Sequence, residues 1–165
     1  MKKILLLLLV GLLAVGAIGC SNTQETGNDV VEVEKEPSVE GTLEEIMEKL
    51  YGGVEIELPE TMHTVIEGDN IAYFLGTDEI TFTEGLASEP MISSAAHSVA
   101  LLRVEEDADI DELMNAIKTN VDPRKWICVG VEEDEVVVDH IGDLVVLIMD
   151  QESEAFHESF LNLVE

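Results

Sequence analysis

Three segments of the chain carry apolar residues at the spacing of one face of an α-helix. The first is 42–52, where Thr42 and Glu45 form a capping box ahead of the apolar positions. The others are 109–121 and 152–164. The apolar positions of the three predicted helices are Leu43, Ile46, Met47 and Leu50; Ile110, Leu113, Met114, Ile117 and Val121; and Phe156, Phe160 and Leu163.

Strands are predicted where short apolar runs alternate with polar residues or are bounded by Gly and Pro. The predicted strands are 54–58, 70–76, 79–85, 91–104 and two strands within 135–150. The last two surround a turn at Gly142, which requires antiparallel pairing. The second of these, 144–149, is apolar without alternation, so we expect it to be central and covered on both faces.

These helices and strands do not alternate one for one along the chain, and the hairpin is antiparallel. The pattern therefore predicts an α+β domain over residues 41–165, in which an antiparallel sheet carries about three helices packed mainly on one face. No internal repeat is visible in the sequence.

The N-terminus has the composition of an export signal. Two lysines precede a 15-residue run, Ile4–Ile18, of apolar residues and glycine, which is short for a membrane-spanning helix. The sequence AIGC, ending at Cys20, is similar to the lipobox of bacterial lipoprotein precursors, in which the cysteine thiol carries a diacylglyceryl group. We expect residues 1–19 to be a signal peptide and Cys20 to anchor the chain in a membrane, at its extracytoplasmic face. An uncleaved anchor helix is the alternative.

A polar, acidic segment without aromatic residues follows the predicted anchor. Residues 20–40 are therefore expected to be a disordered tether. Removal of residues 1–19 would leave 6 basic and 36 acidic residues, a net charge of −30. Such a charge excludes nucleic acid as a partner and favours basic proteins or weakly held divalent cations.

Candidate chemistry in the folded part is sparse. Ser93 and His97 could form a nucleophile and base, but a strand would separate them by about 13 Å. The acids of DADIDE, from Asp107, have calcium-loop spacing but lack the required Gly and Glu, so helix capping explains them better. The four histidines lack zinc-site spacing. Cys128, between Ile127 and Val129, is expected to be buried and inert.

The stretch PRKWIC places Arg124 and Lys125 beside the single tryptophan, Trp126, of an acid-rich chain. We expect Trp126 to be buried at the start of a strand, and the two cations to lie at the surface near acidic neighbours. The alternative is a contact site for a partner formed by Arg124, Lys125 and Trp126.

The segments MISSAAHSVALLRV, DPRKWICV and IGDLVVLIMD, with the helix between the first two, resemble small surface lipoproteins of Gram-positive gut-type bacteria. These carry a C-terminal domain of unknown function, and the resemblance spans residues 41–164. It implies a surface lipoprotein domain and supplies no catalytic residue and no cofactor. A non-enzymatic binding or structural domain is the main hypothesis; a cell-envelope hydrolase and a weak cation-binding module are the alternatives.

Overall fold

The computed structural model describes residues 37–92 and 94–164. Its strands form one five-stranded antiparallel sheet with the order β1-β2-β3-β5-β4. The strands are β1 (Thr61–Val65), β2 (Glu84–Pro90), β3 (Ser98–Arg103), β4 (Val136–Ile141) and β5 (Leu144–Met149). The helices are α1 (Leu43–Gly52), α2 (Ile71–Leu75), α3 (Ile110–Asn120) and α4 (Ser153–Leu161), with short 3-10 turns at Gly68–Asn70, Glu133–Glu135 and Asn162–Val164.

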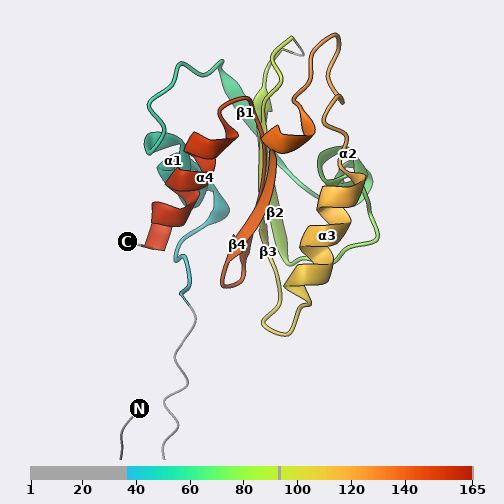
Figure 1. The fold of residues 1–165 in the computed structure, drawn as a ribbon. Coiled ribbons are helices and arrows are strands. Elements are labelled where there is room, and N and C mark those ends of the chain that lie inside the picture. Colours follow the sequence, from blue (N-terminus) through green and yellow to red (C-terminus); the bar gives the residue numbers. More distant parts are fainter. Residues whose placement is uncertain (1–36, 93, 165) are drawn as a thin grey trace, which may run out of the picture. The chain divides into compact units, whose positions relative to one another are not determined.

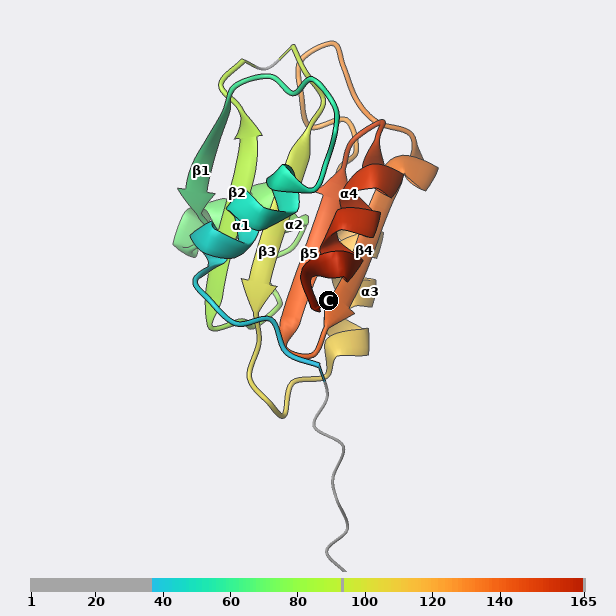
Figure 2. The same cartoon turned by 90° about the vertical axis from the view of Figure 1, so that its left-hand side faces the viewer.

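The domain has three layers. Figure 1 shows the sheet edge-on, with α1 and α4 on one side and α2 and α3 on the other. Figure 2 shows α1 and α4 crossing in front of the strands. Each face of the sheet has its own apolar core: Phe156 and Phe160 of α4 fill one, and Phe74 of α2 and Ile117 of α3 fill the other.

The α+β class and the antiparallel sheet predicted from the sequence are confirmed. The helices, however, are not packed mainly on one face. Helices α1 and α4 cover one face of the sheet, and α2 and α3 cover the other. The cause lies in the centre of the sheet, where every residue of β5 is buried, as the sequence predicts, and β3 is almost as apolar. A sheet centre that is apolar on both faces needs a helical layer on each.

The second layer was missed because the prediction of a strand at 70–76 is wrong. Residues Ile71–Leu75 form α2 instead. Gly76 ends this helix in the left-handed region, with φ of 78°, and its N–H donates to the Ala72 carbonyl at 2.9 Å. So short an apolar run does not distinguish helix from strand by its period, and the glycine cap identifies the helix.

Two other predicted strands are also wrong in position. Residues 54–58 form an irregular connection, because Val54, Ile56 and Leu58 pack against the core beside α1 and α4 without pairing in the sheet. The strand predicted at 79–85 begins only at Glu84. The edge strand β1, which has little burial of its own, was not predicted.

The chain enters the described domain beside the β4–β5 turn. Val39 is buried in the core under α1. The Arg103 guanidinium donates to the Val39 carbonyl at 2.6 Å and to the Gly41 carbonyl at 3.2 Å. At the turn, Gly142 approaches Pro37 so closely that a Cβ there would lie 2.4 Å from the Pro37 oxygen. These contacts fix where the N-terminal segment leaves the domain.

The predicted signal peptide, Cys20 and most of the predicted tether, residues 20–40, lie outside the described residues. Within residues 37–92 and 94–164, no helix has both the length and the hydropathy needed to cross a bilayer.

Candidate functional site

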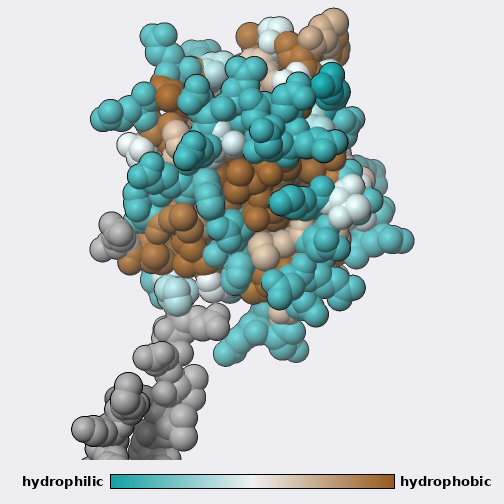
Figure 3. Space-filling view, in the orientation of Figure 1, coloured by the Kyte–Doolittle hydropathy of each residue, from teal (hydrophilic) through white to brown (hydrophobic). Residues whose placement is uncertain are grey.

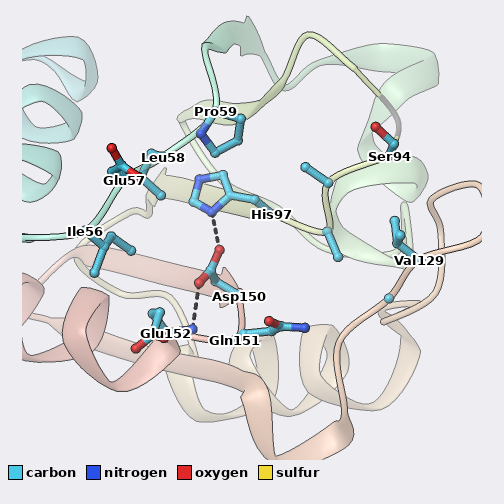
Figure 4. Close-up of a pocket in the computed structure, with 13 residues that line it drawn as sticks. Ile56, Glu57, Leu58, Pro59, Ser94, His97, Val129, Asp150, Gln151 and Glu152 are labelled. Carbon is cyan, nitrogen blue, oxygen red and sulfur yellow. Dashed lines mark hydrogen bonds and ion pairs between the residues drawn. The ribbon is translucent and has the colours of Figure 1, made fainter.

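A hollow of about 600 Å³ opens at the end of the sheet where β3 begins and β5 ends. Four segments that are far apart in the sequence line it (Figure 4). They are the connection after α1, the segment before β3, the loop after α3 and the turn between β5 and α4, namely residues 56–59, 94–97, 129–130 and 150–152. The residues that line it lie where β3 begins and β5 ends, and the chain enters at Pro37 beside the β4–β5 turn, at the other end of these strands.

A buried hydrogen-bonded network borders this hollow. His97 is only 1% exposed, and its Nδ1 lies 2.7 Å from Asp150 Oδ2. Its Nε2 lies 2.6 Å from the Tyr51 hydroxyl, which is also 2.8 Å from Ser88 Oγ. The second oxygen of Asp150 accepts from the Glu152 N–H at 2.6 Å, in the turn just ahead of α4.

The network joins elements from both ends of the chain. Tyr51 belongs to the last turn of α1, and its ring packs edge-on against His97 and Phe156. Burial raises the pKa of the Tyr51 hydroxyl to about 12, so this hydroxyl stays protonated at neutral pH. Asp150 follows the buried strand β5 directly. The network therefore ties α1, β3 and α4 together through polar groups.

Catalysis would require a nucleophile and its general base to reach a substrate bound in the hollow. His97 is 1% exposed and the Ser88 hydroxyl is fully buried, and the third member, the Tyr51 hydroxyl, has its pKa raised by burial to about 12. Ser94 also lines the hollow, but no hydrogen bond between Ser94 and His97 is found in the described part of the chain. Ser93, the other predicted candidate, lies outside the described residues. These groups form a buried hydrogen-bonded network between distant parts of the chain.

The PRKWIC stretch contributes three side chains in three different settings. Arg124 is exposed and lies 3.4 Å from Glu132, as expected of a surface cation. Trp126 is buried, which confirms that prediction, although it sits in an irregular loop and not in a strand. The prediction of a surface position for Lys125 is wrong, since its side chain is 5% exposed.

Lys125 occupies an aromatic cage. Its ammonium lies 4.7 Å from the ring centre of Tyr73, 5.2 Å from that of Phe74 and 5.4 Å from that of Trp126. Glu89 Oε1 approaches the ammonium to 2.6 Å. Burial lowers the pKa of Lys125, and the neighbouring Glu89 carboxylate acts in the opposite direction.

The cage is held together from the sheet side. The Tyr73 hydroxyl donates to Glu89 Oε2 at 3.1 Å, and the Lys125 ammonium donates to Ser98 Oγ at 3.3 Å. Burial raises the pKa of the Tyr73 hydroxyl to about 12, and the negative charge of Glu89 adds to the rise. Lys125 thus fixes the loop after α3 to α2, β2 and β3. Of the three side chains of the predicted patch, Lys125 and Trp126 are buried in the fold, and Arg124 is exposed.

The prediction of a buried Cys128 is wrong. The thiol is exposed, and the residue has a positive φ of 65°. Ile127, beside it, is 70% exposed. The reason is that Trp126 enters the core while the next residues turn back toward solvent, so the apolar run does not form a strand.

The acidic spacing at DADIDE has a capping role at Asp109. Its side chain accepts from the Glu112 N–H at 2.9 Å and begins α3. Among the described residues, no three His, Cys, Asp or Glu side chains come together as metal ligands.

Tyr51, Tyr73, Glu89 and Asp150 are the contributors that sequence reasoning missed. Asp150 offered one clue, since a carboxylate placed directly after six buried apolar residues requires a partner. The others meet their partners only through contacts between distant parts of the chain, which periodicity does not reveal.

Comparisons of the chain with protein-family models, with curated proteins and with solved structures found no match. Function is therefore inferred from the geometry of the domain itself.

Proposed function

We propose that this chain is a lipid-anchored extracytoplasmic protein whose folded domain binds a partner protein and does not catalyse a reaction. The observation that carries the proposal is a set of exposed apolar side chains in two of the loops that contribute residues to the hollow. Met91 and Ile92 follow β2, and Ile127 lies in the loop after α3; all three are exposed. In the space-filling view a small apolar area lies at the upper end of the molecule, where these loops are, and larger apolar areas lie in the middle of the face and at its lower left (Figure 3).

This apolar end is well placed for a tethered binding domain. The chain enters at residue 37, beside the β4–β5 turn, while the loops bearing Met91 and Ile127 lie at the other end of the sheet (Figure 1). These loops therefore lie at the end of the domain opposite the point at which the chain enters it. Exposed apolar patches in such a position are typical of protein-binding sites.

The alternative of a cell-envelope hydrolase is less well supported. It would use His97 and Asp150, yet His97 is 1% exposed and its Nε2 is bonded to the Tyr51 hydroxyl, whose pKa is raised by burial to about 12. The cation-binding alternative rests on the net charge alone.

The test is site-specific photo-crosslinking in the full-length, membrane-bound chain. A photoreactive residue at position 127 should yield discrete protein adducts. The matched control is Leu161, which is also exposed and apolar but lies on α4. We expect adducts from position 127 that are absent from position 161 and are lost with Met91→Ser. Equal labelling from both positions, or none, would contradict the proposal.

The anchor and the absence of catalysis have their own tests. Cys20→Ser should release the protein from the membrane fraction. The purified domain should show no hydrolytic activity on a panel of chromogenic esters and peptides that depends on His97. His97→Gln is the variant that tests this dependence. Hydrolysis that depends on His97 would favour the hydrolase instead.

A further inference from the structure

The edge strand β1 presents a free row of backbone groups. Two hydrogen bonds just beyond the ends of β1 show which of its residues face β2. The Ile66 N–H donates to the Gly85 carbonyl at 2.8 Å, and the Glu60 carbonyl accepts from the Met91 N–H at 3.1 Å. Backbone groups of an antiparallel strand alternate between its two sides. Even-numbered residues of this segment therefore face β2, and odd-numbered residues face outward.

The outward residues of β1 are Thr61, His63 and Val65. Thr61 lies opposite Pro90, which has no N–H. This agrees with the assignment, because the two residues form a pair that exchanges no backbone hydrogen bonds. The Val65 carbonyl is occupied, because it accepts from Asn70 Nδ2 at 2.9 Å. Within the described residues, the remaining outward groups have no hydrogen-bonding partner: the N–H and C=O of Thr61 and His63, and the N–H of Val65.

This edge lacks the features that normally protect a sheet from pairing. Proteins blunt exposed edges with charges, prolines or bulges. The strand TMHTV has no Lys, Arg, Asp, Glu or Pro. Instead it exposes one apolar side chain on each face: Met62 is 57% exposed and Val65 is 54% exposed. Its open side is visible at the left margin of the sheet in Figure 2.

The charge around the edge selects the occupant. Between Lys49 and Arg103 the sequence has nine acidic residues and no lysine or arginine. This stretch contains β1, α2 and β2, and Glu60 and Glu67 flank β1 directly. A second copy of the chain would bring the same carboxylates against each other, whereas a basic segment would neutralise them.

We propose that β1 accepts an extended, lysine- or arginine-rich segment of a partner protein as a sixth strand of the sheet. Backbone hydrogen bonds would come from Thr61 and His63, and apolar contacts from Met62 and Val65. The edge begins beside Met91, whose N–H is held by Glu60, so it is continuous with the apolar end described above. The inference rests on the proposed function and names its binding mode and partner class.

The test uses a labelled peptide of about eight residues that alternates lysine and valine. A glutamate and valine peptide of the same length is its control. Binding to the soluble domain is measured by fluorescence anisotropy, and hydrogen exchange is followed by NMR. The lysine peptide should bind, the glutamate peptide should not, and exchange at Thr61, His63 and Val65 should slow about tenfold or more. The Met62 and Thr64 amides, which face β2, should change little.

A matched pair of variants separates the edge from other surfaces. His63→Pro removes an outward N–H and obstructs an incoming strand, while His63→Ala keeps the N–H. We expect His63→Pro to weaken binding about tenfold or more and His63→Ala to leave it nearly unchanged. Thermal unfolding checks that both variants fold. If His63→Pro does not fold, Val65→Lys, which places a cation on the edge, serves as the second edge-blocking variant.

Three outcomes would overturn the inference. The first is equal binding of the lysine and the glutamate peptide. The second is binding of the lysine peptide to an edge-blocking variant with unchanged affinity. The third is a dimer of the domain that forms in solution and is lost in an edge-blocking variant. Failure of the lysine peptide to bind would also overturn it. None of these results changes the crosslinking expected from position 127, so failure of the edge model and failure of the proposed function can be told apart.

Discussion

Lys125 is a buried cation whose partner is a single carboxylate, Glu89, at 2.6 Å. Removing one member of a buried ion pair leaves the other without compensation and typically costs about 3–5 kcal/mol. Lys125→Met should therefore lower the free energy of unfolding by an amount in this range. Chemical denaturation measures it.

Arg124→Met is the matched control, because Arg124 is the neighbouring cation but is exposed, and such pairs contribute about 0–1 kcal/mol. Lys125→Met combined with Glu89→Gln should be less destabilised than Lys125→Met alone. If Lys125→Met lowered the free energy of unfolding no more than Arg124→Met does, the cage would contribute nothing to stability.

Tyr51 makes stability depend on pH in the alkaline range. Its pKa is raised by burial from 10.0 to about 12, so the folded state keeps a proton that the unfolded state loses. The contribution of the protonated Tyr51 hydroxyl to the free energy of unfolding is fully present below pH 10 and is lost as the pH rises through about 12. Its size is about 3 kcal/mol. Unfolding measured from pH 9 to 12 should show this loss, and Tyr51→Phe should make it smaller, with a remainder from Tyr73, whose pKa is also raised to about 12.

At the scale of elements, the close approach of Gly76 to the end of α3 sets the position of α2. Gly76 has φ of 78°, and a Cβ there would lie 2.2 Å from the carbonyl carbon of Asn120. Gly76→Ala should therefore destabilise by more than the roughly 1–2 kcal/mol that a left-handed conformation alone costs. Gly52→Ala is the control, because its Cβ would meet nothing within 4 Å and should stabilise by up to about 1 kcal/mol. Thermal unfolding of the two variants gives the comparison, and similar melting temperatures would refute it.

The sequence predicted those elements whose pattern is long or capped. The capping box of α1, the Asp109 cap of α3 and the hairpin at Gly142 all lie where expected. Prediction failed for α2 and β1, which are five residues each and owe their conformation to neighbours. The candidate site was predictable only in part, since Trp126 burial follows from its size, but the Lys125 cage depends on Tyr73 and Glu89 from other elements.

At the scale of the whole molecule, the folded domain extends N-terminally to include Val39. A chain beginning at Gly41 would lose this buried side chain, which contributes about 1.5–3 kcal/mol, and one acceptor of Arg103. A chain beginning at Pro37 should unfold at the temperature of the full soluble domain, and one beginning at Gly41 should unfold at a lower temperature. Val39→Ser in the longer chain should lower it as well. Identical melting temperatures would show that Val39 is dispensable.

The contacts of Arg103 also determine how the domain responds to mechanical force. A pull on the chain ahead of residue 37 is transmitted through the Val39 and Gly41 carbonyls to the Arg103 side chain. Arg103 stands at the end of β3, which has β2 and β5 as hydrogen-bonded neighbours on either side. The load is thus passed to an inner strand of the sheet, while the edge strand β1 carries none of it directly. Stretching of the N-terminal segment would therefore leave the conformation of the edge strand β1 and of the apolar loops unchanged.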